Sequence, residues 1–169
     1  MSVTALVVDT SYLVELFKVP GKFSPDFAER VKERFGKAIQ AGHRLYVPVA
    51  VIFEVANHIA HVRHSGDRKK LANLLADTVR SSVETGTPWT ITPAPEDVLA
   101  NLTQLLRLCD KYAKELASQG IGLSDTALID QAGRLKAKYN QPGDRVHIWT
   151  TDGALKAHEP DPEPAPLVS

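Results

Sequence analysis

Residues 3–11 read VTALVVDTS, an apolar run that ends at Asp9 and is followed by two hydroxyl residues. A run without polar alternation is typical of a strand that is covered on both faces, as in a parallel sheet. Three further short runs have the same character, over residues 44–47, 89–92 and 146–150. Together the four runs predict a buried, mostly parallel sheet.

Helical patterns fill the intervals between these strands. Residues 24–26 (SPD) have the form of a helix start, with serine as the cap and proline in the first turn, and Gly42 is the expected stop. Strands that alternate with helices through short loops predict an α/β fold. Further helices are expected over residues 49–64, 67–84, 95–118 and 124–138, the last with Ser124 as its cap.

The composition limits the class of protein. The chain has 169 residues, enough for one domain with its own core, and its 20 Lys and Arg residues balance 20 Asp and Glu residues. Zero net charge argues against bulk electrostatic binding of nucleic acid and leaves a local basic groove open. The single cysteine, Cys109, excludes an internal disulfide and argues against a cysteine zinc site.

Two further features concern location and domain organisation. No apolar run approaches the about 20 residues that a membrane span needs, and no basic segment precedes the apolar run at the N-terminus. We therefore expect a cytoplasmic protein with neither a membrane span nor a signal peptide. Residues 1–158 are expected to form the single domain. Residues 159–169 begin EPDPEPAP, whose alternating prolines predict a solvated, disordered tail.

Acidic side chains fall where strands of the predicted sheet end. Asp9 closes the first strand and opens the first helix, and Asp152 closes the last strand in the same way. In open α/β sheets, ligands bind outside the carboxyl ends of the strands. Asp125 is expected at the first helical position after Ser124, where the alternative role is an ordinary helix cap. Glu54 lies in an apolar stretch of the helix after the second strand, where an unpaired charge is costly.

These four carboxylates are therefore expected to converge at one edge of the sheet. Carboxylates that share a site repel one another and raise each other's pKa values unless a cation lies between them. Carboxylate oxygens suit Mg²⁺ or Mn²⁺ rather than zinc. A site of this kind hydrolyses phosphodiesters by activating water and neutralising charge on the leaving oxygen.

Four motifs at these positions resemble, in order and spacing, the motif series of a known family. The motifs are VVDTS at 7–11, FEV at 53–55, LSDTALI at 123–129 and TTD at 150–152. The family is that of the PIN-domain ribonucleases, and the resemblance covers residues 3–157. Many of its members are VapC toxins, the toxin halves of toxin–antitoxin pairs.

The resemblance implies a metal-dependent endoribonuclease that leaves a 5′-phosphate. It also implies RNA as substrate, a homodimer, and an antitoxin protein as partner. The family's last strand is expected after Asp152, where this chain has its proline-rich segment. The implied catalytic and metal-binding residues are Asp9, Glu54, Asp125 and Asp152, with Thr10, Ser11 and Thr151 beside the site.

Basic residues near Glu54 are candidates for RNA contacts. Three histidines recur at every third position on its helix, and they are expected as a surface stripe because this spacing drifts by about 60° per step. With the four basic residues that lie close to them, they are alternatively a basic rim for the phosphates of a single strand. An ordinary solvated helix junction is the remaining interpretation. The histidines are His58, His61 and His64, and the basic residues are Arg63, Arg68, Lys69 and Lys70.

Other chemistries find no support in the sequence. Ser11 lacks the G-x-S-x-G context of a nucleophile, and the chain has no phosphate-binding glycine motif. Asp130 lies about 140° around the helix from Asp125 and is expected outside the metal site. The sequence thus predicts a magnesium- or manganese-dependent endoribonuclease on a three-layer α/β/α sandwich. The alternative is a catalytically weak PIN-like domain that acts as a nucleic-acid-binding or scaffolding module.

Overall fold

A parallel sheet of four strands forms the centre of the described chain, which comprises residues 2–92 and 98–167 of a computed structural model. Every neighbouring pair of strands is parallel, and Ala5 lies opposite Arg44 on one side and Val146 on the other. The prediction of an α/β fold with a parallel sheet is therefore confirmed. The strands are β1 (Thr4–Val8), β2 (Arg44–Pro48), β3 (Thr90–Thr92) and β4 (Arg145–Trp149), in the order β3-β2-β1-β4.

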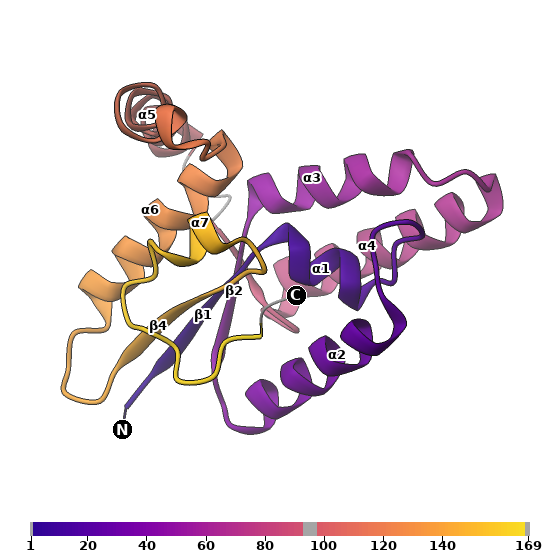
Figure 1. Ribbon diagram of the computed structural model, residues 1–169, viewed down its shortest axis with the longest axis horizontal. Helices are drawn as coiled ribbons and strands as arrows, with labels where there is room; N and C mark the ends of the chain where they lie inside the picture. Colours follow the sequence, from indigo (N-terminus) through magenta and orange to yellow (C-terminus); the bar gives the residue numbers. More distant parts are fainter. Residues whose placement is uncertain (1, 93–97, 168–169) are drawn as a thin grey trace.

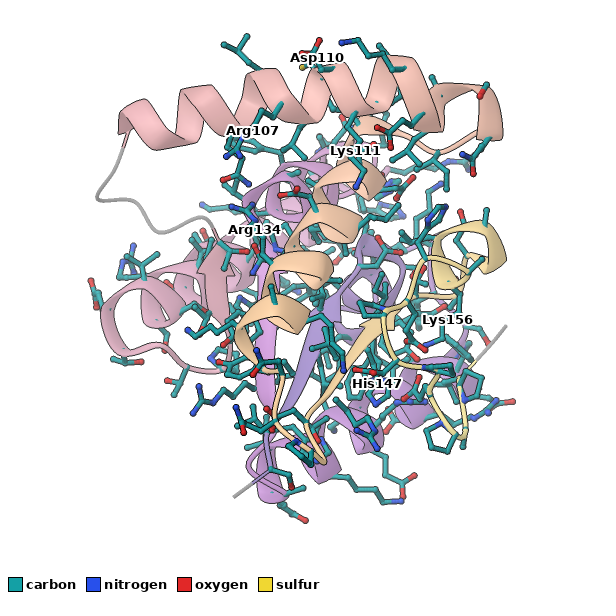
Figure 2. All side chains as sticks on the ribbon, turned by 90° about the vertical axis from the view of Figure 1, so that its left-hand side faces the viewer. Arg107, Asp110, Lys111, Arg134, His147 and Lys156 are labelled. Carbon is teal, nitrogen blue, oxygen red and sulfur yellow. The ribbon has the colours of Figure 1, made fainter. Side chains whose placement is uncertain are left out.

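Helices cover both faces of this sheet (Figure 1). α5 (Val98–Lys111) packs outside α6 (Leu123–Lys138), as Figure 2 shows. There the Arg134 guanidinium of α6 donates a hydrogen bond of 3.0 Å to Gln104 of α5. The result is a three-layer α/β/α arrangement, as predicted. One face carries α6 (Leu123–Lys138), and the other carries α1 (Thr10–Leu16), α2 (Pro25–Gln40) and α4 (Ser65–Thr85). The remaining helices are α3 (Val49–Ala60), which continues from β2, α5 (Val98–Lys111) and α7 (Gly153–Lys156), which follows β4.

The helices expected over residues 49–64 and 67–84 are both present, but the boundary between them lies earlier than expected. α3 ends at Ala60 and α4 begins at Ser65. The Arg68 guanidinium donates hydrogen bonds to the carbonyl oxygens of Val62 (2.7 Å) and Arg63 (3.2 Å), and so stabilises the turn between the two helices. A side chain from the following helix therefore sets this boundary.

Two other helices also differ from expectation. α6 begins at Leu123 with Gly122, rather than Ser124, at the cap position. A helix is expected over residues 95–118, and its expected start lies outside the described residues. The observed helix, α5, has its regular part over Val98–Lys111. It continues as a π-helical turn (Tyr112–Leu116) and a 3-10 turn (Ala117–Gln119). No helix in the two described segments is long and apolar enough to cross a membrane.

Buried side chains pack β1 and β4 side by side. Residues 5–8 of β1 are at most 2% exposed, because this strand has a neighbour on each side and helices on each face. The ring of Tyr12 stacks on that of Trp149 with centroids 5.5 Å apart, and Phe35 meets the same indole edge-on at 5.5 Å. This packing fixes the edge of the sheet at which Asp9 and Asp152 follow their strands.

The proline-rich segment is not a solvated tail over residues 159–167. It passes the free edge of β4 (Figure 1), where the Asp161 carboxylate accepts a hydrogen bond from Val146 N at 2.7 Å. The Glu159 carboxylate accepts one from Ile148 N at 2.8 Å. Within the described residues no strand follows α7, so the further strand that the resemblance implies after Asp152 is not observed there. Over residues 159–167 the segment differs from the expected solvated tail, because alternating prolines remove backbone donors but leave the carboxylates between them free to accept.

Buried charges hold this segment in place. Lys156 of α7 forms ion pairs with Glu159 and Glu163, and its side chain is 16% exposed. Glu163 also accepts a hydrogen bond from the Trp149 indole at 3.1 Å and pairs with Arg34. Figure 2 shows Lys156 beside the C-terminal segment. Two acidic and two basic side chains thus compensate one another where β4 would otherwise be an open edge.

Deletion of residues 159–169 is expected to uncover β4. The buried amides of Val146 and Ile148 would lose their acceptors, and an unsatisfied buried group costs about 1–3 kcal/mol. The melting temperature should fall, and both amides should lose protection in hydrogen exchange. Asp161→Ala alone should remove the protection of Val146, whereas Glu84→Ala, at an exposed position of α4, should not. A truncated chain that exchanges and melts like the full chain would contradict a packed segment.

Candidate active site

Asp9 lies at the carboxyl end of β1 and caps α1. Its side chain accepts hydrogen bonds from the backbone amides of Thr10 (2.6 Å) and Ser11 (3.4 Å), which are unpaired donors of the first turn. The residue is only 6% exposed. Burial raises the pKa of this carboxyl, and the hydrogen bonds it accepts act in the opposite direction.

Two hydroxyl groups connect Asp9 to the loop after β4. The hydroxyls of Ser11 and Thr150 donate to Asp9 Oδ2 at 2.8 and 2.9 Å. The Ser11 oxygen in turn accepts from Thr151 N at 3.2 Å. The Thr150 oxygen accepts from Asp152 N at 3.0 Å. This chain of hydrogen bonds ties the loop after β4 to the start of α1.

Thr150 is the residue of this network that the sequence reasoning missed. It is 2% exposed, and its hydroxyl contacts both the Asp9 side chain and the backbone of Asp152. The sequence pattern predicts it only as the last residue of a strand. Its signal is a hydroxyl residue directly after an apolar strand and two positions before an acidic one. Ser11 and Thr151 were expected beside the site, and both belong to the network.

Glu54 enters the site from the second turn of α3. The Thr10 hydroxyl donates to Glu54 Oε2 at 2.8 Å, which connects the beginnings of α1 and α3. The expectation that this charge lies in a wholly apolar setting is wrong. Glu54 is partly exposed, and the neighbouring Phe53 is 72% exposed. The Glu54 carboxylate is therefore accessible to a ligand.

Asp125 enters from the first turn of α6, at its third helical position rather than the first. Its Oδ2 accepts a hydrogen bond of 3.0 Å from Gly122 N. Burial raises the pKa of Asp125, and the negative charges of Asp9, Glu54 and Asp152 raise it further, against the effect of the Gly122 hydrogen bond. The structure therefore brings together the four carboxylates that the sequence singled out.

Asp152 follows β4 and caps the short helix α7. Its Oδ1 accepts hydrogen bonds from Ala154 N (2.7 Å) and Leu155 N (3.3 Å). This leaves Oδ2 without a hydrogen bond from the described residues, and the same holds for Oε1 of Glu54 and Oδ1 of Asp125. Three of the four carboxylates thus keep one oxygen open.

These open oxygens have the chemistry that Mg²⁺ and Mn²⁺ prefer. However, within residues 2–92 and 98–167 no group of three or more His, Cys, Asp or Glu side chains is arranged to hold a metal ion. Mg²⁺ is commonly bound through one or two carboxylates, with water and substrate phosphate as the other ligands. The donor set fits that mode of binding and does not form a closed protein cage.

The other predicted residues lie apart from this edge. Asp130 pairs with Arg134 at 2.8 Å, in agreement with its expected place outside the site. Arg68 is occupied by the carbonyl oxygens between α3 and α4, so its guanidinium has a structural partner. Lys69 and Lys70 are exposed on α4, and Arg63 is exposed in the turn before it.

Asp125→Asn is expected to stabilise the metal-free protein. Asparagine keeps an acceptor for Gly122 N and removes a charge that Asp9, Glu54 and Asp152 repel. A raised pKa means that the folded state holds the proton more tightly, so wild-type stability falls as the pH rises above the ordinary value of 3.8. The variant should lack the Asp125 share of this loss. In thermal melts with chelator, its advantage over wild type should therefore increase with pH above 3.8.

Asp130→Asn is the matched control, because Asp130 lies on the same helix and pairs with Arg134 instead. Its melting temperature should stay unchanged or fall slightly. Millimolar Mg²⁺ or Mn²⁺ should stabilise wild type and Asp130→Asn more than Asp125→Asn, because a ligand stabilises only the state that binds it. If Asp125→Asn melts below wild type in chelator at neutral pH, Asp125 is a structural cap and the repulsion is refuted.

Thr150→Val is expected to loosen the loop after β4. Valine matches the shape of threonine, but it cannot donate to Asp9 or accept from Asp152 N. Buried groups without partners cost about 1–3 kcal/mol, so the melting temperature should fall. Thr150→Ser keeps the hydroxyl and should recover most of the loss. If Thr150→Val melts like wild type, the hydroxyl does not hold the loop.

Comparison with known proteins gives no family assignment. No protein-family model matches the chain, and no curated protein matches it. The function of the protein is therefore inferred from the geometry of this site and from the order of the motifs in the sequence.

Proposed function

We propose that this protein is a metal-dependent endoribonuclease that hydrolyses RNA phosphodiester bonds at the carboxyl edge of its sheet. The arrangement of four carboxylates from four different elements carries the proposal: burial raises the pKa of Asp125, and the charges of Asp9, Glu54 and Asp152 raise it further. Capping does not require such convergence, since a helix needs only its own capping side chain. Carboxylates gathered in this way are typical of a site that binds a cation.

Mg²⁺ or Mn²⁺ is the proposed cofactor. Glu54, Asp125 and Asp152 would hold it through the oxygens that accept no hydrogen bond from the described residues. When bound, such an ion neutralises charge on a phosphate and lowers the pKa of a coordinated water. Water and substrate phosphate would supply the remaining ligands, as is usual for Mg²⁺.

The protein's own residues have distinct roles in this proposal. Asp9 has both oxygens occupied by donors, so it positions its neighbours and adds negative charge. Thr10 orients Glu54, and the α7 amides orient Asp152. Gly122 N orients Asp125 through Oδ2, and its other oxygen would bind the ion.

The proposal includes the wider expectations of a PIN-domain ribonuclease. These are a cytoplasmic setting, a homodimer, and an antitoxin protein that binds the chain as the partner of a toxin. The alternative, a PIN-like nucleic-acid-binding or scaffolding module, is favoured by one observation, that no three metal-ligating side chains of the described residues form a ready site. Calorimetric titration with Mg²⁺ and Mn²⁺ separates the two, because only the nuclease requires the ion.

Neutralising the acidic residues is expected to abolish cleavage. Each of four single variants should lower Mg²⁺- or Mn²⁺-dependent cleavage of a labelled single-stranded RNA by at least about tenfold, equivalent to roughly 1.4 kcal/mol on the barrier. The products from wild type should carry 5′-phosphates. The variants are Asp9→Asn, Glu54→Gln, Asp125→Asn and Asp152→Asn.

Asp130→Asn serves as the control, since its partner is Arg134 and it lies outside the carboxylate group. It should retain activity close to that of wild type. Wild-type protein that binds no divalent cation, or that cleaves RNA equally well in chelator, would contradict the proposal. Loss of activity in Asp130→Asn with full activity in Asp125→Asn would place the chemistry on a different face of α6.

A further inference from the structure

A cavity of about 430 Å³ lies between the α1–α2 loop and the end of α3. A volume of this size is in the range of small-ligand sites. The α1–α2 loop contributes Pro20, Gly21 and Lys22, and α3 with the turn after it contributes His58, His61, Val62, Arg63 and His64.

The lining of this cavity is basic and contains no carboxylate. Lys22 and Arg63 carry permanent positive charge, and neither side chain forms an ion pair or a hydrogen bond within residues 2–92 and 98–167. Lys18, in contrast, lies four positions before Lys22 and pairs with Glu29 at 2.6 Å. Two cations without a counter-charge in one cavity favour an anionic ligand, and a phosphate group accepts several such hydrogen bonds at once.

Aromatic and apolar groups complete the lining. Pro20 adds an apolar wall, and Val62 is 3% exposed. The Nδ1 atom of His61 lies 2.7 Å from the carbonyl oxygen of Asn57, which holds this ring in place. Imidazole rings are among the side chains on which unpaired bases of RNA stack. The cavity therefore combines a phosphate-binding side with surfaces suited to a base.

α3 connects this cavity to the carboxylates of the candidate active site. Glu54, His58 and His61 follow at spacings of four and three, so they share one face of the helix. Along the helix axis, His58 lies about 6 Å and the helix end at His61 about 10 Å beyond Glu54. A strand whose phosphate lies at the carboxylates can therefore place a neighbouring nucleotide in the cavity.

We propose that this cavity is a nucleotide subsite for the RNA strand, with the phosphate at Lys22 and Arg63 and the base against the histidine rings. The assignment to RNA rests on the proposed nuclease function. It explains how a chain with equal numbers of acidic and basic residues holds a polyanion beside an acidic site, because the positive charge is concentrated at one end of α3.

Binding of a short single-stranded RNA in chelator tests the subsite without cleavage. We expect Lys22→Ala/Arg63→Ala to weaken binding at least tenfold at low salt in fluorescence anisotropy. The slope of log Kd against log salt should fall by about 0.7, because the one phosphate contact that is lost contributes about 0.7 for a single strand. The matched control, Lys32→Ala/Arg107→Ala, removes one lysine and one arginine from exposed positions of α2 and α5 and should bind like wild type. Figure 2 labels Arg107.

A second measurement reports on the cavity directly. A nucleoside 5′-monophosphate should shift the imidazole NMR signals of His58, His61 and His64, and the double variant should lose these shifts. The unphosphorylated nucleoside should produce much smaller shifts. Because Lys22 and Arg63 are exposed, thermal melts should show that the double variant folds like wild type.

The outcomes separate this inference from the nuclease proposal. If Lys22→Ala/Arg63→Ala binds RNA with unchanged affinity and slope, the subsite is overturned and the nuclease stands. If the double variant loses RNA binding but wild type cleaves nothing in Mg²⁺ or Mn²⁺, the nuclease is overturned and the subsite stands. If wild type binds the mononucleotide in the cavity but no RNA, the assignment to RNA is overturned and a free nucleotide is the ligand.

Discussion

A buried carboxylate at the end of the central strand is the constraint on which the candidate site depends. Asp9 is 6% exposed, and a charge in such a place requires hydrogen bonds to its oxygens. The hydroxyls of Ser11 and Thr150 supply two of them, and these hydroxyls then have lone pairs directed at the backbone of the loop after β4. The amides of Thr151 and Asp152 complete the pattern. The hydrogen bonds that satisfy Asp9, at the end of β1, thus also order the loop after β4, which carries Asp152.

The free edge of β4 imposes a second constraint, and the chain meets it with side chains. An edge strand presents unpaired amides, which proteins cover or protect. Here Glu159 and Asp161 accept from that edge, and their burial in turn requires cations. Lys156 is one of these cations, and it belongs to α7, the helix that Asp152 caps. The C-terminal segment therefore stabilises β4 and also the helix on which an acidic residue of the site depends.

The features that local patterns determine were predictable, and those set by distant partners were not. An apolar run followed by an acidic residue locates Asp9 at the end of a strand, because the pattern and the cap lie within a few residues. α6 starts earlier than expected because Gly122 N, and not Ser124, takes part in the cap with Asp125. The break between α3 and α4 was predicted, but its limits at Ala60 and Ser65 depend on Arg68, whose acceptors precede it by five and six residues. No local rule assigns a partner to carboxylates between prolines, so the packed C-terminal segment could not be predicted.

Charge in this protein is balanced overall but separated along α3. Glu54 lies at the middle of the helix, among the carboxylates, whereas Lys22 and Arg63 lie at its C-terminal end. The last carbonyl groups of a helix carry a partial negative charge, which favours cations at that end. The helix end therefore favours Lys22 and Arg63, although neither has a carboxylate partner within the described chain. Their hydrogen-bond donors stay available. The polarity of one helix thus allows an acidic group and a basic cavity to lie within about 10 Å of each other without forming ion pairs. This separation of charge suits a site that must hold both a cation and a polyanion.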